Sequence, residues 1–295
     1  MKNFRAFLFL TGMLVLFTGS ILHAQNDGEK TVLWEISGKD LPGPSYLFGT
    51  IHVMPAEIFR SFPLADQKLK ESQQLVLEMV MDVPLATQVE WAKKMMLPDG
   101  GNLRNLIPED QFGRLRTYVV DSLGVKEKKF ERYLIFKPFA FYSALIPDVI
   151  GRKLESYEMH YTKIARDAEL PVLGLETFEY QLAIFDSIPM NEQVELFFGE
   201  QVDMKKEFAE MIRMYEDQDI YGMAEALEEE NASSDEMEFK LITQRNHNWV
   251  VLLSDWMRQN PSFIAVGAGH LAGDNGLIRL FREAGYVVNP VMLTE

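Results

Sequence analysis

The sequence contains no cysteine. Disulfides, thiolate catalysis and cysteine-ligated zinc are therefore excluded, and stability has to come from core packing. Positive charge is also scarce, because 29 lysines and arginines face 44 acidic residues and give a formal net charge of −15. Such a chain repels phosphate backbones and anionic headgroups, and it carries no basic stripe. We therefore expect no nucleic-acid partner.

Other signals are absent as well. The chain has no Gly-x-Ser-x-Gly elbow, so Ser-His-Asp hydrolysis lacks support. Outside one short motif discussed below, it has no internal repeat, and it has no low-complexity linker. Its 295 residues are enough for one large domain or two small ones. With no boundary in the composition, we predict a single domain over residues 25–295.

Residues 1–24 have the three parts of a secretory signal peptide. Lys2 and Arg5 form a basic start, a mostly apolar stretch follows, and Ala24 stands before Gln25 at a small-residue cleavage position. An uncleaved membrane anchor is the alternative, but the apolar core is short for a span. We expect cleavage near Ala24 and export to the periplasm or the outside of the cell, with no other membrane association.

Strand and helix patterns alternate along most of the chain. Residues 31–40 and 46–50 are predicted to form a hairpin of strands, and further strands are predicted over residues 74–79, 171–176, 262–270 and 286–293. Helical patterns separate them, including an apolar helix over 137–150 and long helical stretches over 191–227 and 236–257. Residues 225–236 indicate a solvated acidic connection. Strands separated by helices predict an α/β layer structure with a helical insertion.

Four of the apolar strands lead into a side chain that can carry chemistry. These residues are His52, Glu78, Glu176 and His270. Ligands of open α/β sheets bind outside the carboxyl ends of the strands. If the four strands run parallel, the four side chains gather along one edge of the sheet.

The two histidines end the same short motif, an apolar run followed by Gly-x-x-His. One such tetrad is weak evidence, because a histidine after a strand is commonly a turn or core residue. Its recurrence after similar apolar runs makes a functional site credible. We expect Gly49 and Gly267 to give the chain a backbone conformation that a side chain would forbid.

Two imidazoles with one or two carboxylates suit a divalent transition metal, which would polarise a carbonyl and acidify bound water. A metal-free alternative uses one histidine as general base, oriented by a glutamate. Each glutamate could also have a purely structural role, as a helix cap or a surface group. His160 and His247 lie in helical patterns and are expected to pack or to face solvent.

The chain resembles the TraB/GumN family, which includes the animal Tiki proteases. The resemblance extends from about Ser45 to Gly285 and depends on an ordered set of short motifs. These are "YLFGTIHVMP", "LVLEM", "KPF" (where Trp is common at the third position), "GLETFEYQ", "RNHNW" and "VGAGHLAGDNGL". Each motif is weak alone, but the ordered set is specific.

This resemblance implies a mixed α/β fold related to erythromycin esterases and ChaN-like haem-binding proteins. For Tiki-like members it implies metal-dependent peptide hydrolysis with manganese or cobalt. Carried over to this chain, it makes His52, Glu78 and His270 the metal-site candidates. Glu176, Arg245 and Asn246 match other signature positions and complete the candidate catalytic set.

Three functions are compatible with these residues. The first is an exported metal-dependent hydrolase acting on a peptide or protein, in which Glu78 or Glu176 moves the proton and Arg245 stabilises the oxyanion or holds a substrate carboxylate. The second is a non-catalytic protein that binds a small ligand such as haem, lined by Tyr46 and the "FKPFAFY" helix. The third is a protein that sequesters a secreted peptide.

Overall fold

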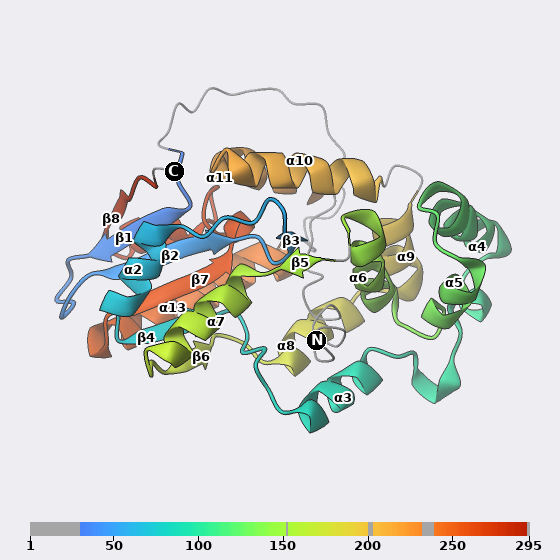
Figure 1. Ribbon diagram of the computed structural model, residues 1–295, viewed down its shortest axis with the longest axis horizontal. Helices are drawn as coiled ribbons and strands as arrows, with labels where there is room; N and C mark the ends of the chain where they lie inside the picture. Colours follow the sequence, from blue (N-terminus) through green and yellow to red (C-terminus); the bar gives the residue numbers. More distant parts are fainter. Residues whose placement is uncertain (1–29, 152, 200–202, 232–238, 294–295) are drawn as a thin grey trace. The chain divides into compact units, whose positions relative to one another are not determined.

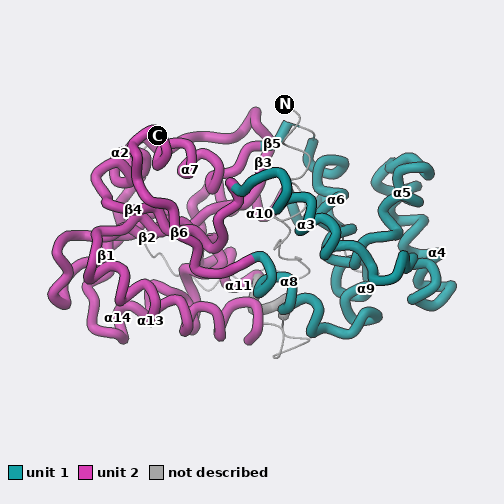
Figure 2. The backbone as a smooth tube through the Cα atoms, turned by 90° about the horizontal axis from the view of Figure 1, so that it is seen from below, with its two compact units in different colours: residues 1–16, 83–154, 178–208 teal, residues 17–82, 155–177, 209–295 magenta. Residues whose placement is uncertain are grey.

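The computed structural model describes residues 30–151, 153–199, 203–231 and 239–293. Here the chain divides into two compact units, coloured separately in Figure 2. Unit 1 comprises Val83–Leu154 and Phe178–Phe208. Unit 2 comprises the described residues before Val83, then Glu155–Thr177, and those from Ala209 onward. The predicted leader, residues 1–24, lies outside the described residues, and the single domain over 25–295 stays a prediction.

Unit 2 is built on a mixed β-sheet. Its strands are β1 (Leu33–Ser37), β2 (Ser45–Thr50), β4 (Gln74–Leu77), β6 (Val172–Gly174), β7 (Ser262–Gly267) and β8 (Val287–Pro290). The order across the sheet is β6-β4-β7-β2-β1-β8 (Figure 1). Strands β6, β4, β7 and β2 run parallel, whereas β1 runs antiparallel to both β2 and β8. The predicted α/β class, with a mixed central sheet, and the β1–β2 hairpin are confirmed.

The parallel strands are apolar because both of their faces are covered. Every residue of β2 (SYLFGT) and of β7 (SFIAVG) is buried. Strands covered on both faces show continuous apolar runs instead of alternation. Apart from Thr50 at the end of β2, the polar side chains pair where the strands begin: the Ser262 amide donates to Ser45 Oγ at 3.0 Å, and Gln74 Nε2 donates to Ser262 Oγ at 2.8 Å.

Helices cover both faces of this sheet. They are α2 (Pro63–Glu71), α7 (Tyr157–Asp167), α11 (Ile220–Asn231), α13 (Gln244–Gln259) and α14 (Leu277–Glu283). Helices α2 and α7 lie on one face, and α13 and α14 lie on the other (Figures 1 and 2). Helix α10 (Met204–Glu216) begins in unit 1 and ends in unit 2, and two further short strands are β3 (Met54–Pro55) and β5 (Leu154–Glu155).

Unit 1 is helical and corresponds to the predicted insertion. Its main helices are α3 (Leu85–Lys94), α4 (Glu109–Arg116), α5 (Glu127–Tyr133), α6 (Pro138–Val149), α8 (Phe178–Asp186) and α9 (Met190–Phe198). Helix α6 is the predicted apolar helix, and it is buried from Pro138 to Ile146. Its aromatic rings pack on α9, with ring centroids 5.1 Å apart for Phe141–Phe198 and 5.2 Å apart for Tyr142–Phe197.

The helical stretch predicted over 191–227 is divided into α9, α10 and α11. Gly199 ends α9, and the Asp219 side chain accepts the Gly222 amide at 2.9 Å, which caps the start of α11. The predicted acidic connection over 225–236 is wrong in its first part, because α11 continues to Asn231. The rest of that segment lies outside the described residues. Among the described helices, none is both long and apolar enough to cross a membrane.

The reason that position 49 requires glycine differs from our expectation. Neither Gly49 nor Gly267 has a positive φ, so the backbone conformation does not demand glycine at either position. Instead, a Cβ at Gly49 would lie 3.1 Å from Ala268 Cα and 3.0 Å from Leu271 Cδ2. Glycine is needed there because the segment after β7 passes close over β2.

Gly49→Ala should therefore destabilise the protein by about 1–3 kcal/mol through overpacking. Gly113→Ala is the matched control, since a Cβ there meets no atom within 4 Å and the residue lies inside α4. We expect the control to be neutral or stabilising by up to about 1 kcal/mol. Urea unfolding of both variants measures the difference, and equal midpoints would contradict the packing argument.

Candidate functional site

The carboxyl ends of the four parallel strands meet at one edge of the sheet. His52 follows β2, Glu78 follows β4, Glu176 follows β6 and His270 follows β7. Glu78 Oε1 lies 4.0 Å from His52 Nε2 and 3.8 Å from His270 Nε2. The predicted gathering of these side chains is therefore observed, with Glu176 joined to the other three through Arg245.

Glu78 lies at the centre of this cluster. Its Oε1 accepts the Gly267 amide at 2.8 Å, and its Oε2 accepts Arg245 Nη2 at 2.7 Å. Burial by itself would raise the pKa of Glu78, but the positive charge of Arg245, with smaller effects from the two histidines and the Gly267 amide, lowers it to about 2. Glu78 is thus an ionised carboxylate in a buried site, with Oε1 facing both imidazoles.

His52 is held by a second carboxylate. Its Nδ1 lies 2.8 Å from Glu158 Oε1, so Nδ1 carries the proton and Nε2 is directed toward Glu78. Glu158 is fixed in turn by Thr50 Oγ1, which donates to Oε1 at 2.6 Å, and by Ser156 Oγ, which donates to Oε2 at 2.7 Å. Burial would lower the pKa of His52, but Glu158, and then Glu78, raise it to about 9.

His270 is held by an amide instead. Its Nδ1 lies 2.7 Å from Asn246 Oδ1. The Asn246 amide is oriented by its own donor bonds from Nδ2, to the carbonyls of His270 at 3.1 Å and Asn275 at 2.7 Å. Nδ1 therefore donates to Oδ1. Burial is the main cause that lowers the pKa of His270, to about 3; Glu78 opposes the shift and the charges of Arg245 and His52 add to it. His270 is neutral at neutral pH.

Arg245 connects the carboxylates. Its guanidinium donates to both oxygens of Glu176 at 2.8–3.1 Å, to Glu78 Oε2, and to the Leu241 carbonyl at 3.1 Å. Its Nη1 also lies 3.3 Å from His270 Nε2. The side chain is completely buried, and the two carboxylates together raise its pKa against the effect of burial. Arg245 and Asn246 begin α13, which delivers both residues to the same place.

Trp249 completes the support around Arg245. It lies one turn along α13 from Arg245, and its ring lies 4.7 Å from the guanidinium carbon. Its indole nitrogen donates to Glu176 Oε1 at 2.9 Å. The same ring is centred 4.5 Å from the His270 ring. Trp249 therefore packs on Arg245 and His270 while it orients Glu176.

Gly267 keeps the centre of the cluster open. A Cβ at this position would lie 3.2 Å from Glu78 Oε1 and 3.3 Å from His52 Nε2. Any side chain at residue 267 would push these two groups apart. The second Gly-x-x-His glycine is thus needed for space in the site, and not for the backbone conformation that we expected.

Two supporting residues were missed from the sequence. Glu158 was not among the candidates from the sequence; it lies in the first turn of α7, which begins at Tyr157 after the Ser156 cap. An acidic residue in a first turn is ordinary helix chemistry, so nothing marked it as a partner of His52. Trp249 was quoted as the aromatic of "RNHNW" but was given no role.

The remaining candidates lie elsewhere. His160 Nε2 is 2.8 Å from Asp66 Oδ1 outside the cluster, and His247 is exposed on α13. Tyr46, considered for a haem slot, is buried in β2 with its hydroxyl 3.3 Å from Glu35 Oε2. The aromatic residues of the "FKPFAFY" helix pack in the core of unit 1. The geometry gives these residues no part in the His–Glu cluster.

The donor set of the cluster suits a divalent metal in kind and in orientation. Imidazole nitrogens and carboxylate oxygens are the usual ligands of such ions. Metal-bound histidines commonly donate their other ring N–H to a side-chain or backbone oxygen. Both histidines do so here through Nδ1, which leaves Nε2 directed at Glu78. His52, Glu78 and His270 are thus the residues that would hold an ion.

The spacing of these atoms is wider than one ion requires. Over the described ranges, no group of three or more His, Asp or Glu side chains is placed to hold a metal as it stands. Ligand atoms at about 2.0–2.2 Å from one ion lie roughly 3.0–3.5 Å apart, compared with 3.8 and 4.0 Å here. Binding would bring the donors closer by about half an ångström and displace Arg245 Nη1 from His270 Nε2.

Comparison with known proteins places the chain in context. The model of the TraB/PrgY/gumN family matches residues 32–290. The chain is also 32% identical over 88 residues to a zebrafish (Danio rerio) protein named metalloprotease TIKI2. That alignment covers 30% of this chain and 17% of the zebrafish protein.

The two histidines should titrate far apart in the metal-free protein. We expect His52 to lose its proton near pH 9 and His270 to stay neutral down to about pH 3, because burial lowers both pKa values and only His52 has the Glu158 carboxylate to outweigh it. Glu158→Gln removes the charge that raises the pKa of His52, so that pKa should fall while His270 remains neutral. Ring ¹⁵N shifts, assigned with His52→Ala and His270→Ala, measure both. A His52 pKa that is the same in Glu158→Gln as in wild type would contradict this geometry.

Proposed function

Because the chain belongs to the TraB/PrgY/gumN family, we propose that it is an exported hydrolase that cleaves peptide bonds with a divalent metal ion. The observation that carries the proposal is the meeting of His52 Nε2, His270 Nε2 and Glu78 Oε1 at one edge of the sheet. The similarity to a protein named as a metalloprotease supports the same reaction class. Manganese or cobalt is the proposed metal.

The ion would act as a Lewis acid on the scissile carbonyl and lower the pKa of a bound water. The surrounding residues keep Glu78 ionised and His270 neutral, as metal binding requires, and they fix the direction of all three donors. Arg245 keeps Glu78 ionised, and Asn246 holds the His270 ring with Nε2 inward. Glu158 holds the His52 ring in the same way.

His52 is the member of the cluster nearest to solvent. Its side chain is 17% exposed, compared with 8% for Glu78 and 2% for His270. A substrate would therefore approach from the side of His52. At neutral pH His52 carries a proton on each ring nitrogen. The proton on Nε2, which faces Glu78, must leave before this nitrogen can bind a metal, whereas Glu158 can keep the other proton on Nδ1.

Glu176 and Arg245 fit positioning roles better than the roles we expected from the sequence. Glu176 accepts from both Arg245 and Trp249, and its side chain is only 6% exposed. Arg245 is completely buried and donates to Glu176, Glu78 and a backbone carbonyl. Proton transfer is assigned to Glu78, whose Oε1 faces the two imidazoles.

The metal-free alternative is less well supported by the geometry. A general base needs an accessible lone pair and a pKa near the working pH. His270 Nε2 faces the Arg245 guanidinium, and the pKa of His270 is lowered to about 3. His52 has a pKa raised to about 9 and is protonated at neutral pH. Neither histidine is poised to take a proton from water without an ion.

Metal content and peptide cleavage should fall together when a ligand is removed. Wild-type protein loaded with Mn²⁺ or Co²⁺ is expected to hold about one ion per chain, and His52→Ala and His270→Ala should lose both the ion and activity. His160→Ala, outside the cluster, is the matched control and should keep both. Elemental analysis and mass spectrometry of a digested peptide mixture give the two readouts. Full cleavage by metal-free wild type would contradict metal dependence.

Glu78→Gln separates the two possible roles of this residue. If Glu78 is a ligand, metal occupancy drops, because a neutral amide binds such an ion weakly. If it only moves the proton, the ion stays and turnover falls by about 10²–10⁴-fold. The same two assays decide between these outcomes, and unchanged occupancy with unchanged turnover would remove Glu78 from the site.

The proposed export predicts that the leader is removed. We expect the exported protein to begin near Gln25, because Ala24 stands at the cleavage position after the basic and apolar segments. Intact mass measured on protein from the exporting cell tests this, and retention of residues 1–24 would contradict cleavage. A form in which Ala24→Arg blocks processing should keep the leader and serves as the reference mass.

A further inference from the structure

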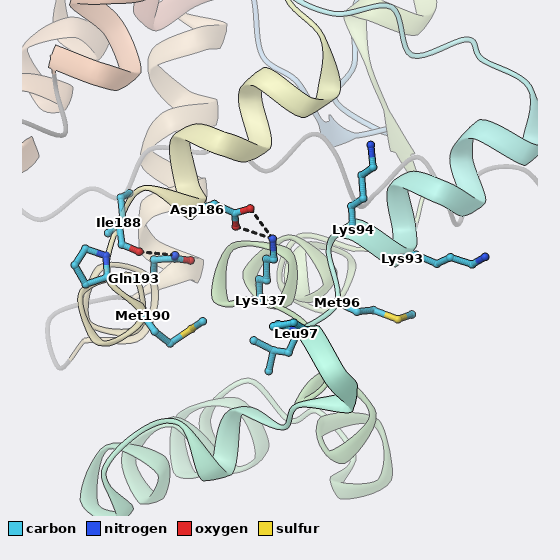
Figure 3. Close-up of a pocket in the computed structure, with 11 residues that line it drawn as sticks. Lys93, Lys94, Met96, Leu97, Lys137, Asp186, Ile188, Met190 and Gln193 are labelled. Atoms are coloured by element: carbon cyan, nitrogen blue, oxygen red, sulfur yellow. Dashed lines mark hydrogen bonds and ion pairs between the residues drawn. The ribbon is translucent and has the colours of Figure 1, made fainter.

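Unit 1 contains a cavity whose lining shares no residue with the His–Glu cluster. Its volume is about 610 Å³, within the range of roughly 300–1,000 Å³ typical of ligand pockets. Its lining residues come from the end of α3, the start of α6 and the α8–α9 connection (Figure 3). Met96, Leu97, Ile188 and Met190 supply apolar surface. Such a lining suits an apolar chain.

The family motif "KPF" leads directly to this cavity. Lys137, the first residue of that motif, precedes α6 and lines the cavity. Its Nζ contacts the two oxygens of Asp186 at 2.6 and 2.7 Å. An ammonium group has three N–H donors, and Asp186 accounts for two. The Lys137 side chain is 17% exposed, so it is a half-buried cation beside apolar surface.

Charge at the cavity opposes that of the whole chain. Lys93 and Lys94 also line it, and Lys94 pairs with Glu179 as Lys137 does with Asp186, so three lysines face two acidic residues. The chain as a whole carries a net charge of −15. A local excess of positive charge next to apolar surface favours a ligand that carries an anionic group on an apolar chain.

Gln193 adds a requirement for a hydrogen-bond donor. Its side chain lines the cavity and the residue is 3% exposed. Nε2 donates to the Ile188 carbonyl at 2.9 Å (Figure 3) and to the Phe185 carbonyl at 2.8 Å, which fixes the direction of the amide. Oε1 is buried with no hydrogen-bond partner among the residues that the structure describes. A ligand N–H would satisfy this acceptor, which is otherwise costly to bury.

We propose that this cavity binds an N-acylated amino acid, either free or as the C-terminal residue of an apolar peptide. The carboxylate would pair with the lysines, chiefly Lys137. The amide N–H would donate to Gln193 Oε1. The side chain and the acyl chain would cover Met96, Leu97, Ile188 and Met190. A simple fatty acid supplies no N–H, and a peptide amide supplies no carboxylate, so neither has all three features.

The test uses N-octanoyl-leucine as the probe and methionine methyl groups as reporters. Met96 and Met190 line the cavity, so their ¹³C-methyl resonances should shift on titration, with assignments from Met96→Leu and Met190→Leu. The His52→Ala protein is used beside wild type so that cleavage cannot consume the probe. N-octanoyl-leucinamide and octanoate should each bind at least about tenfold more weakly, because each lacks one polar contact.

Matched variants test the charges. Lys137→Gln and the double variant Lys93→Gln/Lys94→Gln should weaken N-octanoyl-leucine about tenfold while leaving the weak binding of its amide unchanged. Lys163→Gln, an exposed lysine paired with Asp167 on α7, is the control and should have no effect. An apolar tripeptide with a free C-terminus that binds as tightly as the probe would support the peptide source, and preference for the probe would support the free acyl amino acid.

Three results would overturn the proposal. The first is equal binding of the acid and the amide, because the lysines would then recognise no carboxylate. The second is equal binding of octanoate, which would make the occupant a fatty acid and leave Gln193 without a role. The third is binding that leaves the Met96 and Met190 methyl resonances unmoved, or no binding at all. The comparison of probes on wild-type protein stays decisive even if a lysine variant fails to fold.

Discussion

The buried guanidinium of Arg245 is the constraint on which the candidate site depends. A completely buried cation is unfavourable unless anionic partners surround it, and Glu78 and Glu176 supply them from the ends of two neighbouring strands. The same contacts keep both carboxylates fixed at the sheet edge. Trp249 closes the arrangement by stacking on Arg245 and donating to Glu176. Loss of the guanidinium would leave two buried carboxylates facing each other without a counter-charge.

The two histidines show how one motif can give two chemical states. Each follows an apolar strand as the last residue of Gly-x-x-His, and each donates Nδ1–H to an oxygen. The oxygen belongs to a carboxylate for His52 and to an amide for His270. Burial lowers the pKa of both rings, but the Glu158 carboxylate outweighs it at His52, whereas the Arg245 charge adds to it at His270, so the pKa values move in opposite directions. The site in its metal-free form therefore holds one charged and one neutral ring.

This difference has a consequence for metal binding. Protons compete with an ion at His52 across the neutral range, whereas His270 presents a neutral ring. At His270 the competitor is the guanidinium of Arg245, which lies 3.3 Å from Nε2. An ion would therefore have to displace a proton on one side and a hydrogen-bond donor on the other. Glu78, between the two rings, is held at both oxygens by the Gly267 amide and Arg245.

The four candidate side chains of the sheet edge were recognisable from the sequence. Apolar runs such as those of buried β2, β4 and β7 stand out without tertiary information, because strands covered on both faces must be apolar throughout. The sequence did not reveal that the strands run parallel; the fold provides this order, and it brings His52, Glu78, Glu176 and His270 to one edge. The surroundings of these side chains also depend on the tertiary fold. Glu158 reaches His52 from a helix more than one hundred residues away in the chain, and a first-turn acid has no pattern that reveals such a partner. The roles of Gly49 and Gly267 were likewise decided by neighbours distant in sequence, because a requirement for space depends on what packs there and not on the local backbone.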